Sequence, residues 1–64
     1  DLIDLERPWK DAVEWAESAV RAHYLRGVLE KFEGNVTKAA QHADLDRSNF
    51  RRHLKRYLPN YSER

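Results

Sequence analysis

Several residue types that mark other classes of protein are missing from this sequence. The 64-residue chain has no cysteine, which excludes disulfides and thiolate metal sites. No stretch approaches the roughly 18 consecutive apolar residues of a transmembrane helix, and no charged-then-apolar leader is present. Methionine is absent and the first residue is Asp1, so we expect a piece of a longer protein. A cytoplasmic module without a membrane segment fits these absences best.

Residues that break helices are also scarce. The chain has two prolines and two glycines, and no run alternates apolar and polar residues as a strand does. We therefore predict one all-α domain. Pro8 suits a first helical turn, Gly34 a helix end, Asn35 and Asp46 are natural N-caps, and Pro59 ends the last helix. The predicted division is a linker over 1–7, a long helix over 8–33, a helix-turn-helix over 35–57 with helices over 35–43 and 46–57, and a tail over 58–64, frayed from Asn60 on.

The long predicted helix carries two apolar stripes on different faces. At 3.6 residues per turn, the two stripes are rotated by roughly 150° from each other. The C-terminal stripe can pack on the helices that follow, whereas little in the chain remains to cover the N-terminal stripe. A second copy of the helix is the economical cover, which predicts a homodimer; the alternative is a helix that breaks near 21–23 and folds back. The C-terminal stripe is Tyr24, Leu25, Val28, Leu29 and Phe32, and the predicted dimer interface is Trp9, Ala12, Val13, Ala16, Ala19 and Val20.

The charges of the two halves differ although the total is almost balanced, at +1. Residues 1–33 carry five basic and eight acidic side chains, whereas residues 34–64 carry seven basic and three acidic ones. Within 47–56 there are five basic residues and no acid. The pI of 8.3 is below the basic extreme of many nucleic-acid-binding domains, so the asymmetry is the informative feature.

Residues 34–57 show the pattern of a helix-turn-helix. Ala39 and Ala40 are small neighbours that let another helix cross closely, and Leu45 is an apolar residue for the turn. Phe50, Leu54 and Tyr57 recur at i, i+4 and i+7 and face the core. On the opposite face of the third helix lie amides and cations: Ser48, Asn49, Arg52, Lys55 and Arg56, with Arg51 at the flank. Guanidiniums bond guanine edges, Asn bonds adenine, and cations neutralise phosphates, so this face favours DNA binding over a merely solvated surface.

Over residues 8–58 the chain resembles the Fis-type DNA-binding domain. The residues that carry the resemblance are Tyr24-Leu25, Gly34-Asn35, Thr37, Ala39-Ala40, Leu45, Arg47, Phe50-Arg51 and Leu54-Lys55-Arg56. Such domains lie at the C-terminal end of bacterial activators that depend on sigma-54, the NtrC-like response regulators among them. The resemblance implies a symmetric dimer held by the long helices, with two helix-turn-helix units reading an inverted repeat of double-stranded DNA. It also implies ATPase and sensory or receiver domains upstream, and a place at the bacterial nucleoid.

Site residues follow from the resemblance position by position. Arg47, at the start of the recognition helix, is the leading base-reading side chain. Ser48, Asn49 and Arg52 are also expected to point into the groove. One departure is Asp44, which stands where the family usually has glycine in a left-handed turn. The phosphate contacts that the resemblance implies are Asn35, Thr37, Arg51, Lys55 and Arg56.

Other kinds of site have little support. The three histidines, His23, His42 and His53, lack the i, i+4 spacing of a zinc-binding helix, so we expect no metal and no cofactor. No nucleophile–base set or phosphate-binding glycine loop is present, which argues against an enzyme. The rival class is a helical dimerisation or adaptor module whose basic face docks an acidic protein. Retardation of random duplex DNA at low salt distinguishes the two.

Overall fold

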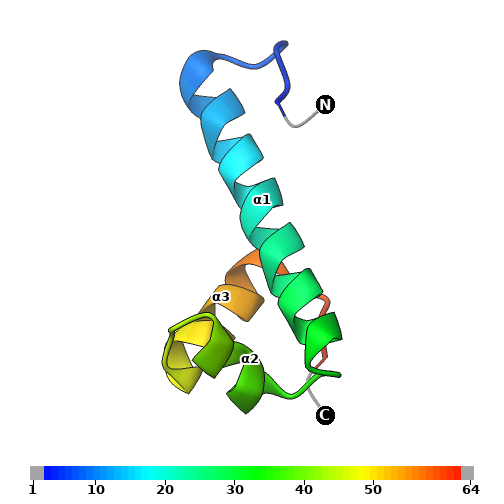
Figure 1. Cartoon of the computed structure of the whole chain (residues 1–64). Helices are drawn as coiled ribbons and strands as arrows, with labels where there is room; N and C mark the ends of the chain where they lie inside the picture. Colours follow the sequence, from blue (N-terminus) through cyan, green and yellow to red (C-terminus); the bar gives the residue numbers. More distant parts are fainter. Residues whose placement is uncertain (1–2, 63–64) are drawn as a thin grey trace.

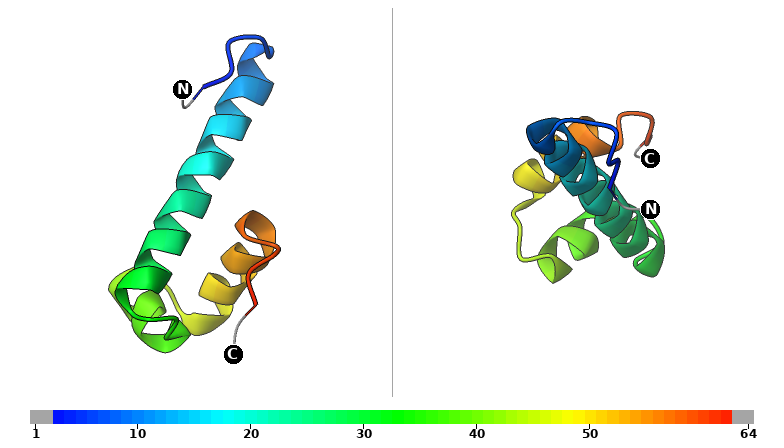
Figure 2. Two further views of the ribbon diagram at one scale, coloured as in Figure 1. Left: turned by 90° about the vertical axis from the view of Figure 1, so that its right-hand side faces the viewer. Right: turned by 90° about the horizontal axis from the view of Figure 1, so that it is seen from above.

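The computed structural model describes residues 3–62 and contains, within them, three helices: α1 (Trp9–Lys31), α2 (Val36–His42) and α3 (Arg47–Tyr57). Their order is the predicted one (Figure 1). The C-terminal half of α1 packs on α2 and α3, while its N-terminal half extends beyond them (Figure 2). Because α1 is unbroken through 21–23, the alternative of a helix that folds back there is wrong.

The end of α1 comes earlier than predicted. The helix stops at Lys31, because both Glu33 and Gly34 have left-handed backbones, with φ of 55° and 82°. The Gly34 N–H then donates to the Leu29 carbonyl over 2.8 Å, which closes the last turn. Glycine takes this conformation without a steric cost, whereas Glu33 adopts it with one.

Both short helices begin at the predicted caps. The Asn35 side chain accepts a hydrogen bond from the Lys38 N–H over 3.0 Å, and α2 begins at the next residue, Val36. The Asp46 side chain accepts from the Asn49 N–H over 2.7 Å and starts α3. Each cap satisfies a backbone donor that the helix leaves unpaired, a contribution of about 1 kcal/mol. The two caps therefore define where the helix-turn-helix begins and where its second helix begins.

The core lies where the three helices meet. Phe50 is completely buried, and the small side chains of Ala39 and Ala40 let α2 approach it closely. Leu45, Tyr57 and other partly buried residues close the edge, as the sequence pattern predicts. The buried cluster consists of Leu25, Val28, Leu29, Val36, Ala39, Ala40, Phe50 and Leu54.

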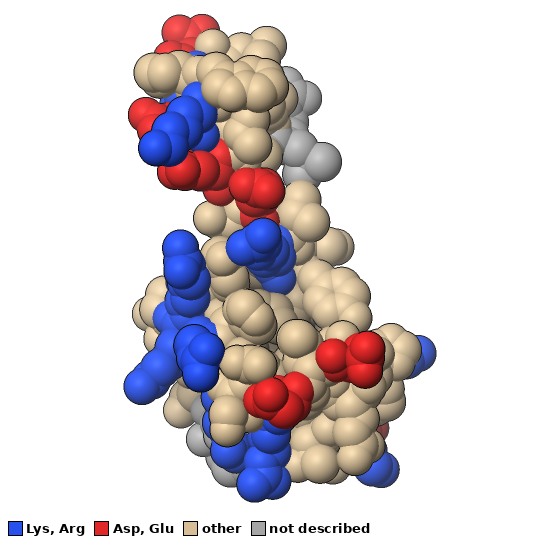
Figure 3. All heavy atoms as spheres, turned by 90° about the vertical axis from the view of Figure 1, so that its left-hand side faces the viewer, with Lys and Arg blue, Asp and Glu red and all other residues tan. Residues whose placement is uncertain are grey.

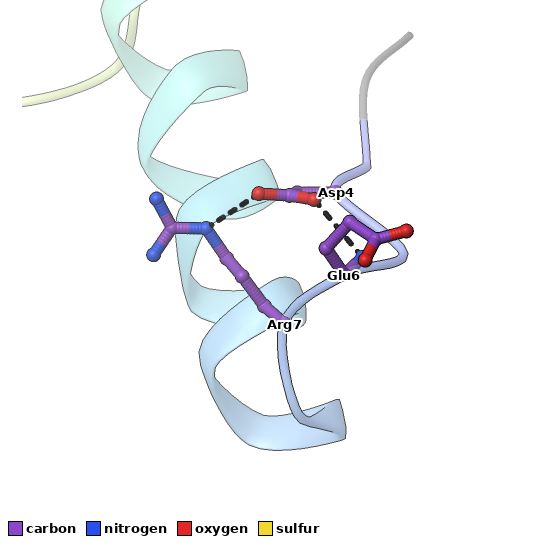
Figure 4. Close-up of polar contacts among 3 residues, drawn as sticks. All are labelled: Asp4, Glu6 and Arg7. Atoms are coloured by element: carbon purple, nitrogen blue, oxygen red, sulfur yellow. Dashed lines mark hydrogen bonds and ion pairs between the residues drawn. The ribbon is translucent and has the colours of Figure 1, made fainter.

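Part of the predicted linker forms a turn before α1; residues 1–2 of that linker lie outside the described residues. Asp4 organises a turn (Figure 4): its carboxylate accepts from the Glu6 N–H and from the Arg7 Nε, both over 3.0 Å. The Arg7 guanidinium also lies over the Trp15 ring, 5.8 Å from its centroid. The chain therefore turns back along α1 at this end.

The C-terminal tail is not frayed at Tyr61. The Tyr61 N–H donates to the Leu58 carbonyl over 2.9 Å, and the ring lies beside the end of α1. The Tyr61 hydroxyl lies 3.7 Å from the position that a β-carbon on Gly34 would take. Residues 63–64 of the predicted tail lie outside the described residues.

Candidate nucleic-acid interface

The face of α3 opposite the core is open to solvent. Phe50 and Leu54 are buried four residues apart on one side of α3, so the opposite side of the helix turns outward. The predicted contact residues of α3 lie on that outer face, and all but the half-buried Asn49 are exposed: Arg47, Ser48, Arg51, Arg52, Lys55 and Arg56. The structure therefore presents five cations from one helix of eleven residues.

Charge is segregated along the molecule in space as well as in sequence. Lys and Arg side chains gather along one edge of the body formed by the short helices, whereas acidic side chains band the projecting part of α1 (Figure 3). Some acidic groups also lie on the lower body. A polyanion approaching the basic edge is thus attracted there and repelled from the shaft of α1.

Arg47 contacts the helix that precedes its own. Its Nη1 donates to the Thr37 hydroxyl over 3.3 Å. The first turn of α3 and the first turn of α2 therefore present Arg47, Thr37 and the cap residue Asn35 on one side of the molecule. This bond joins a predicted base-reading residue to a predicted phosphate contact.

Asn49 is held differently from the other predicted base-reading residues. Its side-chain amide donates to the second oxygen of Asp46 over 3.0 Å, and the residue is half-buried. One of the two N–H donors of this amide is therefore used within the first turn of α3. Asn49 follows an N-cap Asp by three residues, and this spacing is the sequence signal that foretells the contact.

The turn between α2 and α3 has the geometry expected of a glycine position. Asp44 has φ of 61°, and its N–H donates to the Gln41 carbonyl over 3.1 Å. The Leu45 N–H donates to the Ala40 carbonyl over 3.0 Å, so the helix end is fully closed. Among residues 3–62, the Asp44 carboxylate accepts no hydrogen bond. The departure from glycine is thus accommodated in the left-handed conformation.

A contact that the sequence analysis did not predict links α1 to α3. Arg21 donates from Nη1 to the Tyr57 hydroxyl over 2.6 Å, and its guanidinium carbon lies 5.5 Å from the centre of the Tyr57 ring. The hydrogen bond to Tyr57 raises the pKa of Arg21 above its ordinary value. The ring of His53 stacks on the ring of Tyr57, with 6.2 Å between the ring centres. No sequence pattern joins residues 36 positions apart, so only the folded chain reveals this contact.

The predicted dimer residues lie on the part of α1 that projects. Trp9 is 84% exposed and Val20 52%, whereas Ala12 is already buried in the single chain, at 5%. Val13, Ala16 and Ala19 are half-buried. The stripe is covered more than expected, because Ile3 lines one groove together with Val13, Ala16 and Val20.

Among residues 3–62, no group of three His, Asp or Glu side chains is placed to hold a metal ion. The ring centres of His42 and Phe32 lie 5.3 Å apart, and His23 is far from His42 along the chain. No helix in this part of the chain has both the length and the apolar character required to cross a bilayer.

The comparisons with known proteins agree with this geometry. The sequence model of the Fis family of bacterial regulatory proteins matches residues 21–57, which include the C-terminal part of α1 and both short helices. The chain has no match among curated proteins or solved structures. Since the family match covers more than half of the chain and falls on its helix-turn-helix, the protein is a DNA-binding regulatory domain that belongs to the Fis family.

Proposed function

We propose that this domain recognises a specific enhancer sequence for a sigma-54-dependent, NtrC-like transcriptional activator. The observation that carries the proposal is the exposed face of α3, where five cations stand without an acid among them, next to the first turn of α2. An α-helix fits the major groove of B-DNA, where base edges carry a distinct pattern of donors and acceptors. α3 is the helix that enters the groove.

The side chains divide into two roles. Arg47 stands at the start of α3, and the N-terminal residues of a recognition helix contact base edges. Arg47, Ser48 and Arg52 read bases, and Asn49 does so through its side-chain oxygen and its second amide N–H, since the first N–H bonds Asp46. The phosphate contacts are Asn35, Thr37, Arg51, Lys55 and Arg56, which surround the reading residues and fix the position of α3.

The domain acts as a homodimer on an inverted repeat. The projecting half of α1 supports this proposal, because it presents Trp9 and Val20 to solvent beyond the core of the single chain. On an inverted repeat, the two α3 helices of such a dimer enter successive turns of the major groove, which lie about 34–36 Å apart. An operator with two-fold symmetry then matches the symmetry of the protein.

The longer protein that this proposal implies carries ATPase and sensory or receiver domains upstream and works at the bacterial nucleoid, in the cytoplasm. The domain itself performs no catalysis and needs no cofactor. Its part is to deliver the upstream domains to one DNA site.

Selection of bound sites from a random duplex pool tests the proposal. We expect enrichment of an inverted repeat and a bound species with two chains per duplex. A matched pool selected with Arg47→Ala is the control for the reading residue. Enrichment of no sequence, with equal binding to random duplexes, would leave only non-specific DNA binding. Failure to retard any duplex at low salt would favour the adaptor that docks an acidic protein.

A further inference from the structure

The contact between Arg21 and Tyr57 lies at the outer edge of the packing between α1 and α3. The buried residues of α1 that belong to the core begin at Leu25, one turn closer to the C-terminus. Arg21 is exposed, yet it donates a 2.6 Å hydrogen bond to the Tyr57 hydroxyl near the end of α3. Arg21 and Tyr57 therefore connect α3 to α1 one turn before the part of α1 that is buried in the core begins.

The space behind this contact is a groove and not a close-packed interface. The groove has a volume of about 470 Å³ and opens between α1 and α3, lined by Val20, Tyr24, Leu45 and His53 in addition to the bonded pair. Close-packed side chains fix the crossing angle of two helices, and along this open groove α1 and α3 lack such packing. At this end of α3, the hydrogen bond and the ring contact of Arg21 hold the angle instead.

A small change in that angle displaces the end of α1 by a distance comparable to the rise of one base pair. Residues 9–20 of α1 form an arm of about 18 Å, at 1.5 Å per residue. A tilt of about 10° between the arm and α3 displaces one end of the arm by about 3 Å, close to the 3.4 Å rise of one base pair. The angle between α1 and α3 thus decides which spacing of half-sites the two recognition helices match.

We propose that Arg21 and Tyr57 are positioning residues that set the half-site spacing the dimer accepts. This inference rests on the proposed function, since it requires a dimer on an inverted repeat. Neither residue reads a base. Tyr57 acts through α3, and Arg56 beside it lies over the same ring at 5.6 Å, so the pair also adjoins a proposed phosphate contact.

The test measures binding to a series of duplexes that differ only in spacing. Two selected half-sites are separated by the preferred distance, by one or two base pairs fewer and by one or two more; a duplex with a single half-site is also included. Tyr57→Phe removes the hydroxyl and keeps the ring, and Arg21→Ala removes the other partner at an exposed position. Tyr24→Phe is the matched control, because it removes a hydroxyl from the same groove without a bond to α3.

The wild-type domain and Tyr24→Phe should prefer one spacing over its neighbours by about tenfold, a discrimination similar to that of one mismatched base pair. Tyr57→Phe and Arg21→Ala should reduce that preference to about threefold or less, with single half-site affinity within about twofold of wild type. The double variant should resemble Arg21→Ala, which already removes both the hydrogen bond and the ring contact, whereas Tyr57→Phe removes only the hydrogen bond.

Three results overturn the inference. A spacing preference that is unchanged in both variants shows that the core alone sets the angle. If the variants lose the same affinity on the single half-site and on duplexes of every spacing, Tyr57 supports the fold of α3 and does not set the spacing. A wild-type domain that binds DNA without any spacing preference refutes the dimeric reading of an inverted repeat itself, and with it this inference.

Discussion

The guanidinium of Arg47 and the hydroxyl of Thr37 are joined by a hydrogen bond of 3.3 Å between the first turns of α3 and α2. A guanidinium has five N–H donors, so one bond to Thr37 leaves the others for a base or a phosphate. Because both side chains are exposed, the bond contributes little to stability. It does narrow the positions that the Arg47 side chain samples, which reduces the entropy lost when Arg47 docks on DNA.

Arg47→Ala should remove base discrimination. We expect a loss of about 1–3 kcal/mol on the selected site and a smaller loss on random duplexes, because a guanidinium that bonds a base edge contributes mainly to the correct sequence. Titrations of the selected and the random duplex by fluorescence anisotropy at one salt concentration measure the ratio of the two affinities. An unchanged ratio between selected and random duplexes would show that Arg47 is not a reading residue.

Lys55→Ala should weaken binding to every sequence alike. A dimer that places about four cations per chain on phosphates gives a slope of about −7 for log K against log salt, at roughly −0.9 per neutralised phosphate. Each chain of Lys55→Ala loses one of these contacts, so the slope of the dimer should become shallower by about 2. Affinity measured from low to moderate salt gives both slopes. If Lys55→Ala instead alters the preferred sequence, Lys55 contacts a base.

Ala16→Glu should separate the proposed dimer. Ala16 lies on the half-buried stripe of α1, and two-fold symmetry brings the new charge into the interface twice. Unpaired buried charges should cost several kcal/mol and shift the domain toward the monomer. Sedimentation equilibrium gives the mass, and Ser18→Glu, which adds the same charge on the opposite face of α1, is the control. Equal masses for wild type and Ala16→Glu would remove this interface.

The two glycines should respond to alanine with opposite signs. Gly34 has φ of 82°, so Gly34→Ala should cost about 1–2 kcal/mol. Gly27 lies in the middle of α1 with no atom within 4 Å of an added β-carbon, so Gly27→Ala should stabilise by up to about 1 kcal/mol. Each kcal/mol moves the unfolding midpoint by about 4–8 °C in a domain of this size. A lower midpoint for Gly27→Ala would indicate that a partner chain approaches α1 at this glycine.

The sequence predicted those parts of the structure that local chemistry decides. The caps at Asn35 and Asp46 depend on side chains three residues from the N–H that they bond, and the spacing of Phe50 and Leu54 defines the buried face of α3. The left-handed turn at Asp44 follows from the position of glycine in the family. Each of these features requires only neighbours along the chain.

Contacts between distant residues could not be predicted in the same way. The bond from Arg21 to Tyr57 depends on the crossing angle of two helices, which the whole core determines. The early end of α1 depends on Glu33 taking a left-handed backbone, which its residue type does not favour. The position of Tyr61 beside Gly34 follows from the direction in which the chain leaves α3.

Asp44→Gly should stabilise the domain and tighten DNA binding at low salt. Asp44 holds φ of 61°, where an L-residue is strained by about 1 kcal/mol and glycine is not. Glycine also makes the unfolded chain more flexible, so we expect a net gain of up to about 1 kcal/mol. Removal of the carboxylate from the turn before α3 reduces repulsion of phosphates, an effect that should fade as salt screens it.

The opposite result for Asp44→Gly has a specific meaning. An Asp side chain can cap a backbone N–H in a turn, and its loss would then lower the unfolding midpoint. Within residues 3–62, the Asp44 carboxylate caps no such donor, and the turn is closed by its backbone bonds from the Asp44 and Leu45 N–H groups. Asp44→Asn is the matched control: it removes the charge but keeps the size and tolerates a left-handed backbone. Asp44→Asn should therefore reproduce the change in DNA binding without the full gain in stability. A lower unfolding midpoint for Asp44→Gly would show that the backbone of Asp44 is not strained.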